Sequence, residues 1–152
     1  MSRRKSRILA FQALYSWDVS KSSLEDILTF SWLQNDSEIK EGIEQSEPTD
    51  SLKEDETFAT LIIQGTIDHV DEIDNTIKQY LSSNWSMDRI NKVALAILRT
   101  ATYEIMFQKD IDPKISIDEA VHIAQDYGTD DSFKFINAVL DKIGKNERSK
   151  LA

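Results

Sequence analysis

The sequence predicts an all-α protein, a compact bundle of about seven helices, and three observations support this fold class. The 152 residues include only two prolines and four glycines. Apolar residues recur in most segments at the spacing that lines one face of a helix. No segment keeps the alternation of apolar and polar residues that a half-buried strand requires. A chain of this length forms one domain with a substantial core, so residues 1–152 are expected to be a single helical domain.

The first helix is expected to carry a basic cluster. Four of the first seven residues are basic although the whole chain has a net charge of -9: Arg3, Arg4, Lys5 and Arg7. At about 100° per residue, Ile8, Phe11 and Tyr15 fall within about 60° of one another, and the arginines spread over an adjoining arc of about 100°. A cationic cluster on an acidic protein indicates a local site for a polyanion. The alternative is a frayed basic terminus that only aids solubility.

The next segment predicts a second helix and an acidic connection. Ser22-Ser23-Leu24-Glu25 resembles a capping box that opens a helix through Leu33. Between Asn35 and Glu56, nine acidic residues accompany only two lysines. This composition is typical of a solvated loop, so residues 35–54 are expected to be a flexible acidic segment.

The middle of the chain predicts three further helices. Apolar residues are periodic from about Glu54 to Leu81, which is long for one globular helix. A break near Asp68-His69 would divide this stretch into two helices. Another helix is expected from about Met87 to Phe107.

Two helices are expected to complete the chain. Pro113 interrupts the pattern, Ser116-Ile117-Asp118-Glu119 forms a second capping box, and Gly128 suits the C-terminal stop. The last helix is expected to start within residues 129–132 and to end near Gly144. The basic residues after Leu140 would either lengthen a basic surface or keep a tail soluble.

Catalytic and metal chemistry finds little support in the sequence. There is no cysteine, which excludes disulfides and thiolate chemistry, and the isolated glycines form no phosphate-binding loop. Glu119-Ala120-Val121-His122 has the Glu-x-x-His spacing of di-iron bundles, but the other histidine stands in Thr66-Ile67-Asp68-His69, where threonine replaces the glutamate. We therefore expect no enzyme, no metal and no cofactor.

No apolar run approaches the roughly 20 residues that span a membrane, so a cytoplasmic protein without membrane contact is expected.

Three blocks of sequence occur in a recognisable order. The first is Gln12-Ala13-Leu14-Tyr15-Ser16-Trp17 after the arginine cluster, and the second is Leu98-Arg99 followed by Tyr103-Glu104. The third joins Ile117-Asp118-Glu119-Ala120-Val121 to the stretch from Tyr127 to Asp141. Together they resemble the NusB family of transcription antitermination factors, over nearly the whole chain apart from the acidic segment.

The resemblance implies a NusB-like helical fold without catalytic activity. NusB proteins pair with NusE, a small-subunit ribosomal protein. The pair binds single-stranded boxA RNA in nascent transcripts, notably those of ribosomal RNA operons. There it helps the transcription elongation complex pass terminators. By position, two clusters would form the RNA surface: Arg3, Arg4, Lys5, Arg7, Gln12 and Tyr15, and Asp131, Lys134 and Phe135. The helix with Arg99, Tyr103 and Glu104 would lie toward NusE. The resemblance is compatible with either a monomer or a homodimer for the free protein.

The residue types of the N-terminal cluster agree with this assignment. Single-stranded RNA is bound through phosphate contacts from basic residues, stacking on aromatic rings and amide hydrogen bonds to base edges, and the cluster supplies all three. Tyr15 and Phe135 suit core packing as well as base stacking, and Arg99, within an apolar helix, also suits a buried ion pair. The alternative function is a helical protein-interaction module without RNA contact.

Overall fold

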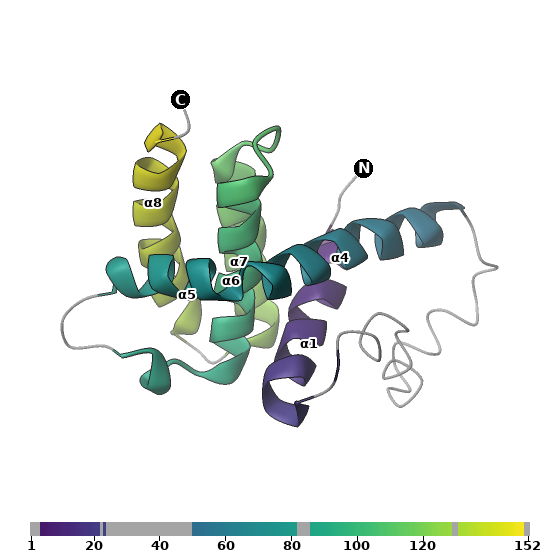
Figure 1. Ribbon diagram of the computed structural model, residues 1–152, viewed down its shortest axis with the longest axis horizontal. Helices are drawn as coiled ribbons and strands as arrows, with labels where there is room; N and C mark the ends of the chain where they lie inside the picture. Colours follow the sequence, from purple (N-terminus) through teal and green to yellow (C-terminus); the bar gives the residue numbers. More distant parts are fainter. Residues whose placement is uncertain (1–3, 22, 24–49, 82–85, 129–130, 151–152) are drawn as a thin grey trace.

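Six α-helices and one short 3-10 helix make up the described part of the computed structural model, which comprises residues 4–21, 23, 50–81, 86–128 and 131–150 (Figure 1). The helices are α1 (Arg4–Ser20), α4 (Asp50–Asp68), α5 (Val70–Gln79), η2 (Met87–Arg89), α6 (Lys92–Phe107), α7 (Pro113–Tyr127) and α8 (Ser132–Lys150). These described residues include no strand, and the predicted all-α class is confirmed. Arg3, the predicted second helix and residues 35–49 of the acidic segment lie outside the described residues.

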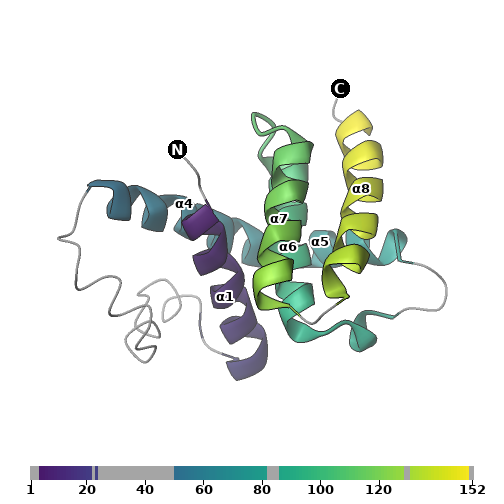
Figure 2. The same cartoon turned by 180° about the vertical axis from the view of Figure 1, so that it is seen from behind.

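The helices cross in two directions. Helices α4 and α5 run nearly end to end along one side of the molecule, and α1, α6, α7 and α8 stand across them (Figure 1). The view from behind shows α1, α7 and α8 on the opposite side (Figure 2). Helix α6 packs against α1, α4, α5, α7 and α8, so it forms the centre of the bundle.

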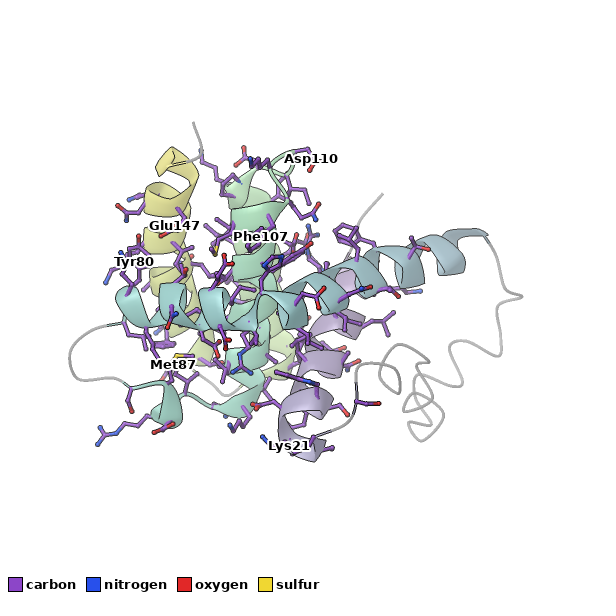
Figure 3. The ribbon with its side chains drawn as sticks, in the orientation of Figure 1. Lys21, Tyr80, Met87, Phe107, Asp110 and Glu147 are labelled. Carbon is purple, nitrogen blue, oxygen red and sulfur yellow. The ribbon has the colours of Figure 1, made fainter. Side chains whose placement is uncertain are left out.

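The core follows from this central position of α6. Every residue of α6 from Ala94 to Ile105 is buried, as expected for a helix that is surrounded by others. The large side chains with the least exposure come from α1, α4, α5, α6 and α8: Leu14, Ile62, Ile63, Ile73, Ile77, Ile97, Leu98, Ile105, Ile136, Leu140 and Ile143. At the rim, the Tyr80 hydroxyl donates to Glu147 Oε1 at 3.0 Å and ties the end of α5 to α8 (Figure 3).

The predicted break between α4 and α5 is confirmed. Helix α4 ends at Asp68 and α5 begins at Val70. The His69 amide still donates to the Gly65 carbonyl at 3.1 Å, and the His69 carbonyl accepts from the Ile73 amide at 2.9 Å, so the two helices are joined without a loop. Helix α4 begins at Asp50, and the last residues of the predicted flexible segment are therefore helical.

The start of α6 lies later than the sequence predicted. The Asn91 side chain accepts hydrogen bonds from the amides of Val93 at 2.8 Å and Ala94 at 3.3 Å. This cap satisfies two of the amides that a helix start leaves without a partner, so α6 begins at Lys92. Met87 belongs instead to η2.

The predicted start of α7 and the predicted end of α8 were wrong. Asp112 caps α7 through a hydrogen bond from the Lys114 amide at 3.0 Å, and Pro113 fits the first helical position because its missing amide would have no partner there. Gly128 follows α7 as predicted. Helix α8 continues through Gly144 to Lys150, because an interior glycine costs a helix only about 1 kcal/mol and here packs close to Ile117 of α7.

Candidate nucleic-acid interface

The outer face of α1 carries four of the predicted RNA-binding residues. Counted at about 100° per residue, Arg4, Lys5, Gln12 and Tyr15 fall within an arc of about 100°. Lys5 is exposed, Tyr15 is 39% exposed, and Arg4 and Gln12 are half-buried. The opposite face of α1 packs on α4 and α6. We call these four residues the α1 cluster.

Gln12 of the α1 cluster is half-buried. Its Oε1 atom is buried and finds no hydrogen-bond partner within the described part of the chain. A buried amide oxygen without a partner is costly.

Arg7 lies on the buried side of α1, unlike the rest of the basic cluster. Its Nε atom is 3.0 Å from both carboxylate oxygens of Glu104, and its Nη2 atom is 2.7 Å from Oε1. The Ser116 hydroxyl donates to the same Oε1 at 3.3 Å. Because Arg7 and Glu104 are 7% and 2% exposed, Arg7 would have to leave this carboxylate to reach a phosphate.

The sequence therefore misassigned the inner face of α1. The predicted apolar arc joined Ile8, Phe11 and Tyr15, but Tyr15 is exposed and Ile8 is half-buried. The buried arc is centred instead on Ala10 and Leu14, which are 0% exposed. Arg7 lies within this buried arc because the Glu104 carboxylate neutralises its charge. The spacing of apolar residues in α1 does not reveal that partner.

Arg4 is bound by an acidic residue of α7. Its Nε atom donates to Glu119 Oε2 at 2.7 Å and its Nη2 atom to Oε1 at 3.3 Å. The hydrogen bond from Arg4 lowers the pKa of Glu119 below its ordinary value, and the same contact raises the pKa of Arg4. The Arg4 side chain remains 43% exposed. Glu119 of the Glu-x-x-His motif therefore belongs to an ion pair. Among the described residues, no group of three or more possible metal ligands occurs.

The second predicted cluster lies at the start of α8. The Lys134 Nζ atom is 3.8 Å from Asp131 Oδ1, and the side chains are 71% and 88% exposed. The predicted pairing of these two residues is confirmed, with Asp131 in the turn directly before α8 rather than on the helix itself. Phe135 is half-buried and packs against the edge of the core, which places it between the two alternatives of core packing and base stacking. We call these three residues the α8 cluster.

Tyr127 was not singled out by the sequence; its ring contacts α1, and it precedes Asp131 by four residues in the chain. It is the last residue of α7 and is 47% exposed. Its ring meets Phe11 of α1 edge-on, with centroids 5.3 Å apart and planes at 61°. The following Gly128 comes close enough to Ser132, the first residue of α8, that a Cβ atom at position 128 would overlap the serine hydroxyl. Two sequence signals could have found it: it directly precedes a helix-ending glycine, and it begins the stretch Tyr127 to Asp141 of the third block.

The predicted partner residue Arg99 forms a buried ion pair. It is 8% exposed, and its Nε and Nη2 atoms donate to the two carboxylate oxygens of Asp74, each at 2.9 Å. Its Nη1 atom lies 3.6 Å from Asp18 Oδ2 at the end of α1. The buried ion pair considered from the sequence is confirmed, and it links α6 to α5 and α1.

Tyr103 and Glu104, the other predicted partner residues, are also buried. Tyr103 is 7% exposed and packs against Gly65 of α4, while Glu104 holds Arg7. Direct contact of these side chains with a partner stays a prediction, and it would require them to leave their buried positions. What they do in this structure is join α6 to α4 and α1.

Exposed carboxylates gather at the junction of α4 and α5. Asp68, Asp71 and Glu72 are exposed, and the His69 ring between them stacks on Phe107 at a centroid distance of 4.3 Å. Phe107 lies at the end of α6, beside this junction (Figure 3). An acidic surface of this kind favours a basic partner.

Among the described residues, no helix combines the length and apolar character needed to cross a membrane.

Similarity to known proteins covers nearly the whole chain. The model of the NusB family matches residues 4–145. The transcription antitermination protein NusB of Treponema denticola is 48% identical over 143 residues, which cover 94% of this chain and 96% of that protein. The protein of the same name from Borreliella burgdorferi is 39% identical over 145 residues, with 94% of each chain covered.

Solved structures show the same architecture. The structure of T. maritima NusB superposes with a TM-score of 0.77 at 33% identity and covers 99% of this chain and 96% of that chain. A crystal structure of the antitermination factors NusB and NusE in complex with dsRNA gives a TM-score of 0.73 at 26% identity, covering 94% of this chain and 96% of that chain. With a family match over residues 4–145 and relatives up to 48% identical, this chain belongs to the NusB family.

Proposed function

We propose that this chain is a transcription antitermination factor that binds boxA-type single-stranded RNA together with the ribosomal protein NusE, as part of the transcription elongation complex in the cytoplasm and without catalytic activity. Family membership and the NusB–NusE–dsRNA complex of a relative support this function. The observation that carries it is the α1 cluster, which presents two cations, an amide and an exposed ring on one helix face.

The chemistry of the α1 cluster favours unpaired RNA. Arg4 and Lys5 supply the positive charge that phosphate binding requires, and Tyr15 offers a ring on which a base can stack. Bases are accessible for stacking and for amide hydrogen bonds when the strand is single, whereas an A-form duplex is recognised mainly by shape and backbone. The α1 cluster therefore suits a single-stranded segment better than a duplex.

The α8 cluster would extend the same surface. Lys134 is exposed and can contact a phosphate, but Asp131 lies beside it at 3.8 Å and repels one. Asp131 therefore fits an RNA site either by neutralising Lys134 or by accepting a hydrogen bond from a base. Half-buried Phe135 would support this edge of the site.

NusE binding is proposed on electrostatic grounds. The chain has a net charge of -9, and Asp68, Asp71 and Glu72 are exposed at the α4–α5 junction. Ribosomal proteins are basic, and complementary charge accelerates encounter and favours the correct partner. The buried Arg99, Tyr103 and Glu104 would contribute by keeping the helices beneath this surface in position.

The experiment that tests the function measures binding of a fluorescently labelled boxA RNA oligonucleotide by this chain, by NusE and by an equimolar mixture. We expect the mixture to bind more tightly than either protein alone, and calorimetry to give a one-to-one protein complex. The double variant Asp71→Lys/Glu72→Lys should weaken NusE binding, while RNA binding by the chain alone stays unchanged. NusE binding without any RNA contact by this chain would support the alternative of a protein-interaction module.

A further inference from the structure

We infer that Tyr127 stacks on an RNA base and joins the α1 and α8 clusters into one RNA path. This inference rests on the proposed RNA-binding function and adds a residue to it. It concerns a side chain on α7, a helix that supplies none of the RNA-binding residues expected from the sequence.

Exposed aromatic side chains are few, and they lie around one buried ring. The large apolar residues exposed in the described part of the chain are Tyr15, Val19, Leu61, Ile115 and Tyr127. Of these five residues, the two tyrosines are the ones with an aromatic ring. Tyr15 follows Phe11 by four residues on α1, so it lies one helical turn away on the same side. Tyr127 contacts Phe11 edge-on from α7. The three rings thus form a row from α1 to the end of α7.

The contact with Phe11 orients Tyr127 without covering it. The two ring planes meet at 61°, an edge-on arrangement that can cover no more than one face of the Tyr127 ring. The side chain is still 47% exposed. A ring whose direction is set by a buried neighbour loses little conformational freedom when a base stacks on it, which is the advantage of a preformed site.

The charges around Tyr127 favour a base over a phosphate at this position. Asp126 precedes it in α7 and is exposed, and exposed Asp131 follows just before α8. Both repel phosphate groups. The cations of the proposed site belong to the two clusters: Arg4 and Lys5 on α1, and Lys134 on α8. A strand could therefore place phosphates near the cations and a neutral base on the Tyr127 ring.

The test compares three substitutions at this position in the full chain with NusE present. Tyr127→Phe keeps the ring and its packing on Phe11, Tyr127→Leu keeps apolar bulk without a flat face, and Tyr127→Ala removes both. If the ring stacks on a base, Tyr127→Phe should bind boxA RNA within about twofold of wild type, while the leucine and alanine variants should bind about 5- to 100-fold more weakly. Ile115→Ala, at an exposed apolar position near the start of α7, is the matched control and should bind as wild type.

A second measurement reports stacking directly. In a boxA oligonucleotide with 2-aminopurine at successive positions, one of the positions quenched with wild type should stay quenched with Tyr127→Phe and recover its fluorescence with Tyr127→Leu, while a position stacked on Tyr15 should stay quenched in both variants. Wild-type RNA affinity in both the leucine and alanine variants, with Tyr15→Ala weakened, would overturn the role of Tyr127 and leave the proposed function standing. Failure of the wild-type protein with NusE to bind the RNA would instead overturn the proposed function itself.

Discussion

Arg4 and Arg7 are three residues apart on α1 and have opposite environments. Arg4 is bound to Glu119 with 43% of its side chain exposed. Arg7 is bound to Glu104 in the core, where the two side chains are 8% and 2% exposed. An exposed pair can exchange its carboxylate for a phosphate, since arginine binds both groups in the same bidentate way. A buried pair contributes to the fold, because removing one partner leaves a charge without compensation.

This contrast predicts different effects for the two arginines. Arg7→Ala would leave the buried Glu104 carboxylate without its guanidinium, next to the Ser116 hydroxyl, and we expect the unfolding free energy to fall by about 3–5 kcal/mol. Arg4→Ala should lower the unfolding free energy only slightly, because its pair with Glu119 is partly exposed, and it should weaken RNA binding. Urea denaturation and RNA titration of both variants measure the two effects, and a fully stable Arg7→Ala protein would contradict the structural role of the buried pair.

The Arg4–Glu119 contact predicts a pH dependence. Arg4 lowers the pKa of Glu119, so the folded state holds the charged carboxylate more strongly than the unfolded state does. The resulting stability is present above the ordinary glutamate pKa of about 4.3 and disappears as the pH falls through the lower folded value. Denaturation midpoints of wild type and Glu119→Gln, measured from about pH 6 down to about pH 3, should converge at the acidic end. A constant difference across this range would argue against the ion pair.

Asp131 offers a test of charge at the α8 cluster. Asp131→Asn keeps the shape of the side chain, removes the anion and releases Lys134 from its 3.8 Å pair. We expect RNA affinity to be maintained or strengthened, because the substitution removes a repulsive charge beside the phosphate path. Fluorescence titration at constant salt measures this. A large drop in affinity in a folded variant would show that the carboxylate makes a required interaction with the RNA.

At the level of elements, the sequence predicted helices well where local signals decide the structure. The stop at Gly128 was predicted from the glycine itself, and the break at His69 from the length of the apolar pattern between Glu54 and Leu81. The start of α7 was not, because Asp112 with Pro113 and Ser116 with Glu119 are both good start signals, and the earlier one is used. The inner face of α1 was misassigned for a different reason: Arg7 is buried by Glu104, 97 residues away in the chain, and helical periodicity contains no information on such a partner.

The packing of α4 on α6 depends on a glycine. A Cβ atom at position 65 would overlap the Tyr103 ring, which is buried in α6. We expect Gly65→Ala to lower the unfolding free energy by about 1–3 kcal/mol, despite the higher helix propensity of alanine. Gly144→Ala is the matched control, since its Cβ would lie 3.3 Å from the end of the Ile117 side chain and should have a much smaller effect. Thermal unfolding compares the two, and equal stability of both variants would contradict the close α4–α6 packing.

At the level of the whole molecule, the proposed RNA site draws on three helices that are far apart in the sequence. Helix α1 supplies the α1 cluster, the end of α7 supplies Tyr127, and the α8 cluster lies at the start of α8. The same chain presents exposed carboxylates at the α4–α5 junction. Helix α6 packs against all of these helices, so it fixes the position of the proposed RNA site relative to the acidic α4–α5 junction. A factor that binds RNA and a basic protein at the same time requires such a fixed arrangement.

The salt dependence of RNA binding tests the central claim, that the outer face of α1 contacts RNA phosphates, most directly. The affinity for boxA RNA with NusE present is measured over a range of salt concentrations for wild type and for Arg4→Ala/Lys5→Ala, the α1 variant. The control is Lys78→Ala/Arg89→Ala, which removes the same amount of positive charge at exposed positions on α5 and η2. The α1 variant should bind more weakly, and the slope of log affinity against log salt should flatten by about 0.7 for each phosphate that the protein no longer binds. The control should keep the wild-type slope. An α1 variant with the wild-type slope would contradict the claim that Arg4 and Lys5 bind phosphates.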